Sequence, residues 1–303
     1  MGKKILLTGG TGLIGRALCR LWAGDGHHLM VWSRRPKAVP ALCSGARGVA
    51  RLDDIGDFDS PDAVVNLAGA PIADRPWSDS RRRLLWDSRV GLTRELTGWL
   101  SSLPLPPQVL LSGSAAGWYG DRGEQPIDET AQAAQVPSDF GSRLCQAWED
   151  EARRAESPRT RVVLLRTASV LAAEGGMLAR LRVPFRLGLG GRLGSGEQWL
   201  PWIHLDDATA LIDFLLKRED CRGSYNICAP QPVRNAEFTR ALAAALHRPA
   251  CLPVPAWALR LGLGEMSGLL LASQRLLARR AQEAGYRFRF PDLDAALRDL
   301  IGP

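Results

Sequence analysis

A glycine-rich turn near the start of the chain constrains the fold more than any other stretch. The segment 5–8 is short, mostly apolar and followed by glycine, which is typical of a buried strand. From residue 13, apolar side chains recur at helical spacing. Between them lies Gly9-x-x-Gly12-x-x-Gly15. The first glycine allows a tight strand-to-helix turn, the second lets a pyrophosphate approach the backbone, and the third lets the helix pack closely on the strand. The turn therefore predicts a dinucleotide at the helix N-terminus, where free N–H groups and the helix dipole favour anions. We assign to this site Gly9, Thr11, Gly12, Leu13, Ile14 and Gly15.

The end of the second predicted strand, residues 28–33, indicates which dinucleotide binds. A site for NAD places a carboxylate here to hold the ribose 2′-hydroxyl, whereas a site for NADP uses arginine for the 2′-phosphate. This chain has no acid at that point and reads Ser33-Arg34-Arg35, a hydroxyl and two guanidinium groups suited to phosphate. We therefore predict NADP(H). The alternative interpretation is two ordinary surface arginines in a turn.

Alternation of strands and helices predicts an α/β fold with a doubly wound, parallel, Rossmann-type sheet. Further strands are expected at residues 48–52, 62–70, 109–112 and 161–166, the last continuing toward 169–171, and helices at 78–100 and 140–156. The strand at 62–70 breaks at the small residues Ala68-Gly69-Ala70, which let a ligand lie against the backbone, so Gly69 is also assigned to the cofactor.

Beyond residue 175 the pattern changes to a glycine-rich loop at 188–199, a helix over 208–216 begun by Asp206 or Asp207, a strand at 224–228 and a helix at 236–246. We divide the chain into a dinucleotide-binding domain, 1–170, and a smaller C-terminal substrate lobe, 171–303, with elements in 203–228 allowed to return to the first domain. Glu197, Gln198 and Trp199 offer polar and stacking groups for a substrate pocket.

Composition excludes several classes of protein. The net charge is +7, but the only run of basic residues, 81–83, lies on a predicted helix without interleaved aromatics, so we expect no nucleic-acid partner. Because no apolar run reaches about 18 residues and the first strand begins near residue 4, we expect no membrane partner and no signal peptide. The six cysteines form no metal-binding spacing and indicate a reducing cytoplasm, with no metal site.

Taken together, these motifs resemble the extended short-chain dehydrogenase/reductase superfamily, and more narrowly its atypical, NADP-binding "epimerase family" branch, whose members are often named nucleoside-diphosphate-sugar epimerases. The resemblance covers nearly the whole chain. Besides the segments above, it rests on Asn66-Leu67-Ala68-Gly69, Trp77, Ser88-Arg89, Trp118-Tyr119-Gly120, Trp148-Glu149, residues 184–191 and Trp202-Ile203-His204. It implies that Ser33 and Arg34 hold the 2′-phosphate, that Leu67 and Ala68 pass along the cofactor, and that Arg89 reaches it from the long helix. Ser169, at the start of the last segment of the sheet, is assigned to the cofactor as well.

The catalytic pair of the superfamily is missing. Its working members carry Tyr-x-x-x-Lys on the helix after the serine loop, whereas here Phe140 stands in place of the tyrosine and no lysine occurs between residues 37 and 217. Ser114 occupies the position of the substrate-binding hydroxyl, and Tyr119 is the candidate acid/base. A free tyrosine pKa near 10 is too high for that role at neutral pH, so the nicotinamide ring or an arginine such as Arg89 or Arg166 would have to lower it. The alternative interpretation of Tyr119 is a half-buried aromatic residue in a turn. His204 is better interpreted as a structural histidine than as a base.

The sequence is compatible with two classes of function. The first is an NADP(H)-dependent oxidoreductase or epimerase acting on a small polar substrate, such as a nucleotide sugar, with Ser114 and Tyr119 as catalytic residues. The second is a catalytically weak or inactive protein that binds NADPH and responds to it. The sequence leaves the substrate and the oligomeric state open.

Overall fold

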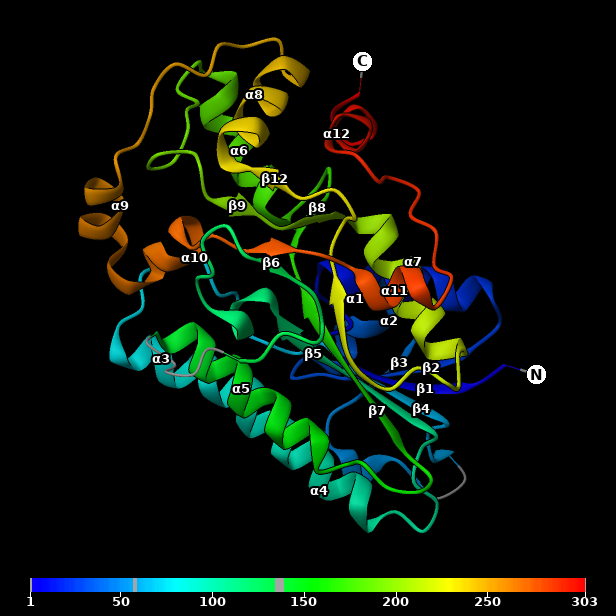
Figure 1. Cartoon of the computed structure of the whole chain (residues 1–303). Coiled ribbons are helices and arrows are strands. Elements are labelled where there is room, and N and C mark those ends of the chain that lie inside the picture. The colour runs from blue at the N-terminus through cyan, green and yellow to red at the C-terminus, as the bar shows by residue number, and fades with distance from the viewer. Residues whose placement is uncertain (1, 57–58, 134–138, 303) are drawn as a thin grey trace.

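A computed structural model describes residues 2–56, 59–133 and 139–302 (Figure 1). Its centre is a sheet of seven strands in the order β11-β7-β5-β4-β1-β2-β3, and every neighbouring pair is parallel. The strands are β1 Lys4–Thr8, β2 His28–Trp32, β3 Arg47–Val49, β4 Ala63–Asn66, β5 Val109–Ala115, β7 Arg161–Thr167 and β11 Gly223–Ile227. The predicted doubly wound α/β fold is therefore confirmed.

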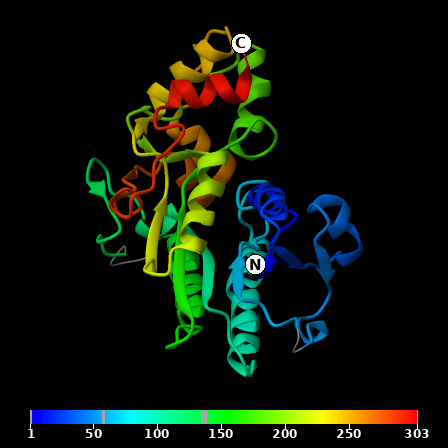
Figure 2. The same cartoon turned by 90° about the vertical axis from the view of Figure 1, so that its right-hand side faces the viewer.

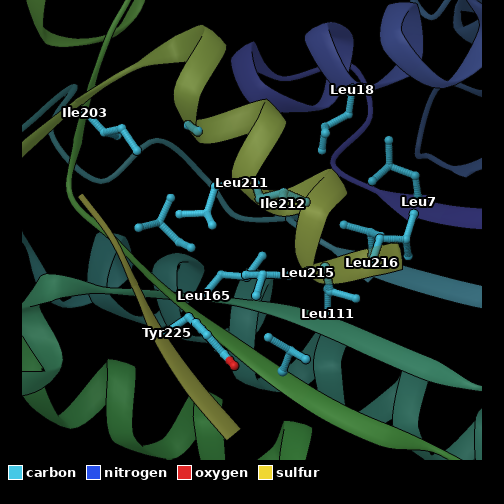
Figure 3. Packing of buried hydrophobic residues seen from close by; sticks show 14 of the residues in the cluster. Leu7, Leu18, Leu111, Leu165, Ile203, Leu211, Ile212, Leu215, Leu216 and Tyr225 are labelled. Atoms are coloured by element: carbon cyan, nitrogen blue, oxygen red, sulfur yellow. The ribbon is translucent and has the colours of Figure 1, made fainter. Parts of the chain in front are cut away.

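Helices cover both faces of the sheet because neighbouring residues of each strand point to opposite faces. Leu7, Leu111 and Leu165 pack against α1 Leu13–Gly24 and α7 Leu205–Lys217 in one cluster (Figure 3). Leu6 and Leu110 pack in a second cluster with α4 Leu92–Ser102 and α5 Phe140–Arg153. These strands are thus buried on both sides, which explains their continuous apolar sequences.

The smaller lobe lies beyond the carboxyl ends of the strands, where β7 leads directly into β8 Ser169–Leu171 (Figures 1 and 2). Its own apolar cluster includes Leu178, Phe238 and Leu297 from three helices. These helices are α6 Gly176–Arg186, α8 Asn235–Ala245 and α12 Leu293–Ile301. The described residues also form three two-stranded sheets, which pair β10 Trp202–His204 with β8, β12 Val233–Arg234 with β9 Trp199–Leu200, and β13 Arg275–Leu276 with β6 Pro126–Ile127. The shorter helices are α2 Val39–Leu42, α9 Ala256–Leu263, α10 Gly268–Leu271 and α11 Arg279–Glu283.

Three details differ from the sequence-based expectations. The helix predicted at 78–100 is α3 Asp79–Trp86 and α4 joined by one π-helical turn, Asp87–Gly91. The strand expected at 62–70 ends at Asn66, because the chain turns there toward the glycine loop. The helix predicted to begin at Asp206 or Asp207 begins at Leu205, with the His204 side chain accepting the capping hydrogen bond from the Asp206 N–H.

Asp207 has another function in the fold. Its carboxylate accepts hydrogen bonds from the backbone N–H groups of Arg289 and Phe290, each at 2.8 Å, and so holds the C-terminal segment on α7. The structure places β11 in the large sheet and α7 on its face, so the segment 203–228 contributes to both halves of the molecule. No helix in the described part of the chain has both the length and the apolar character needed to cross a bilayer.

Candidate cofactor and substrate site

The glycine turn between β1 and α1 has the geometry that its sequence predicts. Gly9 has a φ of +70°, and a Cβ there would lie 2.6 Å from the Leu67 carbonyl, so only glycine fits without strain. A Cβ at Gly15 would lie 2.3 Å from the Gly9 oxygen, which is the close helix-to-strand contact expected for the third glycine. Gly12 is the N-cap of α1, it is exposed, and no side chain caps the helix. Within the described residues no side chain accepts from the first N–H groups of α1, which leaves them available to an anion.

A buried polar network fixes the turn after β4 against the glycine loop. Asn66, which is fully buried, accepts a hydrogen bond from Thr8 Oγ1 at 2.7 Å, and Thr8 Oγ1 in turn accepts from the Ala68 N–H at 3.1 Å. The Asn66 amide donates to Thr93 Oγ1 at 2.8 Å and to Ser112 Oγ at 3.1 Å. One side chain thus joins β1, β4, β5 and α4, and residues 67–69 are held beside Gly9. The sequence alone pointed to Leu67, Ala68 and Gly69 as cofactor contacts but gave no sign of Thr8, Thr93 or Ser112 as their support.

The π-helical turn brings Ser88 and Arg89 to Ala70, in the turn after β4. Ser88 Oγ accepts from the Ala70 N–H at 3.0 Å, and Arg89 Nη2 donates to the Ala70 carbonyl at 3.0 Å. A Cβ on Gly69 would lie 2.8 Å from the Arg89 guanidinium carbon, so that glycine makes room for the arginine. Burial lowers the pKa of Arg89. In the described residues Arg89 has no carboxylate partner, which leaves a cation at this edge of the sheet available to a ligand.

The turn after β2 presents two further cations. Arg34 and Arg35 are exposed, and neither forms an ion pair within the residues that the structure covers. Ser33 Oγ accepts from the Arg35 N–H at 3.1 Å, which orders the turn. A cavity of about 430 Å³, lined by Pro36, Lys37 and residues 47–50 among others, lies immediately beyond it.

Ser114, at the end of β5, belongs to a buried ionic network that the sequence did not reveal. Its hydroxyl donates to Glu149 Oε1 at 2.7 Å, and Arg166 donates to both oxygens of the same carboxylate at 2.8 and 2.9 Å. Arg153 adds a fourth hydrogen bond at 2.8 Å. Because Glu149 is fully buried, loss of any of these partners would leave a buried carboxylate oxygen without compensation. A signal for the pair was present: Glu149 interrupts the apolar face of α5, and Arg166 interrupts an apolar strand.

Tyr119 lies at the other end of this network. Its hydroxyl accepts from Arg166 Nη1 at 3.0 Å and donates to Asn226 Oδ1 at 2.8 Å, and the side chain is fully buried. Arg166, one of the three cations suggested to lower the pKa of Tyr119, thus contacts it. Burial outweighs this cation, however, and raises the pKa of Tyr119 to about 12. The arrangement favours the interpretation of Tyr119 as a structural aromatic over its use as a general base.

The positions of the superfamily's tyrosine and lysine are apolar and closed. Phe140 and Leu144 are buried in a cluster with Trp77, Trp148 and Met266. Glu265, from the smaller lobe, accepts from the Phe140 N–H at 2.8 Å and pairs with Arg82 at 2.8 Å. The C-terminal segment therefore seals the start of α5.

The predicted substrate residues divide between surface and interior. Gln198 is buried, and its amide donates to the carbonyls of Leu193 and Leu270 at 2.9 and 3.1 Å. It was expected to face a substrate, but its side chain instead supports the loop. The guanidinium groups of Arg234 and Arg275 lie 4.6 and 4.8 Å from the ring centre of Trp199, whose indole N–H donates to Glu124 at 3.0 Å. Glu197 is exposed and pairs with Arg234 at 3.2 Å.

Two other polar residues occupy the border between the lobes. Ser169 is partly buried, and its N–H donates to the Pro201 carbonyl at 3.1 Å, next to the pairing of β8 with β10. His204 is buried, stacks on Phe290 with ring centres 3.9 Å apart, and caps α7 through Nδ1. Burial lowers the pKa of His204, and its contacts agree with the structural interpretation.

With this geometry in place, comparison with known proteins identifies the family. Residues 5–228 match the model of the NAD dependent epimerase/dehydratase family. The chain belongs to this family. Residues 254–300 also match a family described only as a domain of unknown function, DUF1731. In this chain that segment contains Glu265 and Met266, which contact the start of α5.

Relatives share the whole length of the chain. It is 35% identical over 303 residues to the mouse epimerase family protein SDR39U1, covering 98% of this chain and 99% of that one, and 34% identical to the epimerase family protein YfhF of Bacillus subtilis, covering 98% of each. The crystal structure of human SDR39U1 (isoform 2) with NADPH superposes with a TM-score of 0.89 at 33% identity, covering 98% of each chain. A nucleoside-diphosphate sugar epimerase from Corynebacterium glutamicum gives a TM-score of 0.78 at 29% identity and covers 59% of that longer chain. The predicted resemblance to the epimerase branch is confirmed.

Proposed function

We propose that this protein binds NADP(H) across the carboxyl ends of β1, β2 and β4. The observation that carries the proposal is a set of three arginines at the carboxyl ends of the strands on either side of β1: Arg34 and Arg35 after β2, and Arg89 beside the turn after β4. None of them has an ion-pair partner in the described residues. The buried arginines Arg81 and Arg166, by contrast, pair with carboxylates. Unpaired cations at a helix N-terminus suit the phosphates of a dinucleotide. The likeness to a human relative solved with NADPH supports the same cofactor.

The residues present fit the parts of NADP(H). The first turn of α1, from Gly12 to Ile14, would hold the pyrophosphate, and Ser33, Arg34 and Arg35 the 2′-phosphate. Leu67 to Gly69 and Arg89 would contact the half of the cofactor that lies toward β5, with Ser114 and Ser169 at its far end. When bound, NADPH supplies a hydride. The chain's own contribution is to bind and orient the cofactor at the edge of the sheet.

The first candidate for chemistry with the bound cofactor is oxidoreductase or epimerase activity on a small polar substrate, of which a nucleotide sugar is one example. The ordered Ser114 hydroxyl favours it. Because the Ser114 proton is donated to a carboxylate that only accepts, Ser114 can offer a ligand its lone pairs but not its hydrogen. A ligand group bound opposite Ser114 would therefore be a donor, such as a hydroxyl or an amide.

The second candidate is an NADPH-responsive protein without turnover. Phe140 and Leu144 replace the acid/base pair, and the phenol of Tyr119 is buried with its pKa raised to about 12. Nothing within the described residues near Ser114 replaces the missing tyrosine and lysine, so proton transfer would be slow. Stoichiometric NADPH binding without conversion of any nucleotide sugar would select this candidate over the first.

Calorimetric titration of NADPH and NADH tests the cofactor. Arg34→Ala should weaken NADPH binding by about 1.5–3 kcal/mol, the scale of hydrogen bonds to charged groups, and leave NADH binding nearly unchanged. Arg298→Ala, which removes an exposed arginine from α12 in the other lobe, is the matched control and should change neither. Equal losses for both cofactors in Arg34→Ala would contradict the assignment of the 2′-phosphate, and absence of NADPH binding to the unaltered protein would contradict the proposal itself.

A further inference from the structure

Two neighbouring segments of the smaller lobe form one continuous edge of the molecule. They are residues 180–192, from α6 into the glycine-rich loop, and residues 248–261, which lead into and through most of α9 (Figure 1). Backbone hydrogen bonds join them: the Leu252 N–H donates to the Gly190 carbonyl at 3.1 Å, and the Val254 N–H donates to the Arg192 carbonyl at 2.9 Å. We call these two segments the lobe-edge surface.

The lobe-edge surface holds most of the strongly exposed apolar side chains. In the described residues, the large apolar side chains that are at least half exposed are Leu105 and six in this surface: Val183 (63%), Leu187 (69%), Leu189 (55%), Leu252 (50%), Trp257 (68%) and Leu261 (83%). Helix α9 buries none of its residues. Trp257 and Leu261 are four residues apart and so lie on one face of it. A helix on a globular protein normally packs one apolar face on the core, and clustered exposed apolar side chains mark an interaction site.

The same surface is strongly basic. It carries Arg180, Arg182, Arg186, Arg192, Arg248 and Arg260, while no Asp or Glu occurs between Glu174 and Glu197 or between Glu237 and Glu265. None of the six forms an ion pair with any described residue, and three of them donate only to backbone carbonyls. Six unpaired charges in a chain whose net charge is +7 indicate an acidic partner.

We propose that the lobe-edge surface attaches this protein peripherally to a bilayer containing anionic lipids. Leucine and valine side chains interspersed with arginine, and a tryptophan among them, are the composition that partitions into a bilayer interface. Arginines near such a surface gain from the negative potential of the headgroups. A second copy of the chain would bring like charges together, and a nucleic acid would leave the leucines uncovered. Our expectation of no membrane partner rested on the lack of a spanning segment, which a peripheral contact does not need.

Sedimentation with lipid vesicles tests the proposal on the full-length protein with NADPH present. Vesicles of phosphatidylcholine and phosphatidylglycerol at a 7:3 ratio should retain the protein at low ionic strength, pure phosphatidylcholine vesicles should retain much less, and added salt should release it. The double variant Trp257→Ser/Leu261→Ser should bind the anionic vesicles about tenfold or more weakly. Arg186→Ala/Arg260→Ala should lose a similar factor and also much of the salt dependence.

Matched controls separate this surface from general effects. Leu105→Ser removes another leucine that is more than half exposed, from the loop after α4, and Arg298→Ala removes an exposed arginine from α12; both variants should bind vesicles like the unaltered protein. All variants should keep NADPH binding, which reports an intact fold. The proposal is overturned by failure to bind anionic vesicles, by equal binding to neutral ones, or by equal losses in the Leu105→Ser control. It is also overturned if Trp257→Ser/Leu261→Ser instead abolishes a dimer in light scattering, or if RNA retardation depends on the arginines alone.

Discussion

Tyr119, Arg166, Glu149 and Ser114 show how single residues acquire a role from their partners. Each hydrogen bond along this line joins a different element, from the turn after β5 to β7, α5 and back to β5. Arg166 also lies over the Trp118 ring, 3.3 Å from its centre. Because all of these groups are buried, each one left unpaired would cost free energy comparable to a lost hydrogen bond or more. The network therefore fixes the position of Ser114 at the carboxyl end of β5.

At this scale we predict the behaviour of Tyr119→Phe. The change leaves Asn226 Oδ1 and Arg166 Nη1 without their common partner and should lower the free energy of unfolding by about 1–3 kcal/mol. NADPH affinity should be unchanged, and so should the rate with any substrate that is turned over, since the phenol remains protonated. Urea unfolding and calorimetry measure the two effects. Loss of turnover with stability intact would restore the general-base hypothesis.

At the scale of elements, the site depends on two departures from regular structure. The glycine turn lets α1 begin against β1, and the π-helical turn between α3 and α4 rotates Ser88 and Arg89 toward Ala70. Such π-turns occur often at functional sites, because the extra residue redirects side chains without breaking the helix. A regular helix over 78–100 would present a different set of side chains to the turn after β4.

Two glycines of α1 provide a matched test of the turn. Gly15→Ala would place a Cβ 2.3 Å from the Gly9 oxygen, so the helix must move, which should destabilise the protein by about 1–3 kcal/mol and weaken NADPH binding. Gly24→Ala, in the last turn of the same helix, meets no atom within 4 Å and should be neutral or stabilise by up to about 1 kcal/mol. Thermal unfolding and calorimetry of both variants give the comparison. Equal effects at the two positions would show that the close contact at Gly15 is unimportant.

At the scale of the whole molecule, side chains fasten the smaller lobe to the sheet domain. The Gln274 amide donates to the carbonyls of Ala116 and Gly120, each at 2.9 Å, and Glu265 holds the start of α5. The turn that carries Tyr119 is therefore fixed from the C-terminal segment, far away in the sequence. The lobes meet through specific hydrogen bonds, and unfolding must break them together.

Burial of weak acids throughout the molecule predicts how its stability depends on pH. Burial raises the pKa of Tyr119 and of Tyr225 to about 12, and it raises the pKa of the buried thiols of Cys19 and Cys145 to about 12 as well. The unfolded chain then loses these protons at lower pH than the folded protein, so the stabilisation is present below about pH 8.5 and is lost as pH rises toward 12. Each tyrosine should contribute roughly 3 kcal/mol to this loss once it is ionised in both states. Urea unfolding between pH 8 and 11 should show stability falling, with a smaller fall in Tyr119→Phe; a flat profile would contradict the prediction.

The sequence by itself determined the parallel sheet, the order of its elements and the glycine turn. These depend on local properties: period-two and helical patterns place side chains on faces, and a left-handed φ at Gly9 demands glycine wherever the rest of the chain lies. Only the tertiary structure decided that Gln198 faces inward, that Tyr119 is locked by Arg166 and Asn226, and that α9 stays uncovered. Each of these depends on which distant segment packs beside the residue. A hydrogen-bond partner 35 residues away, as for Ser114 and Glu149, follows from the rotation and register of whole elements, and the pattern of neighbouring residues does not encode it.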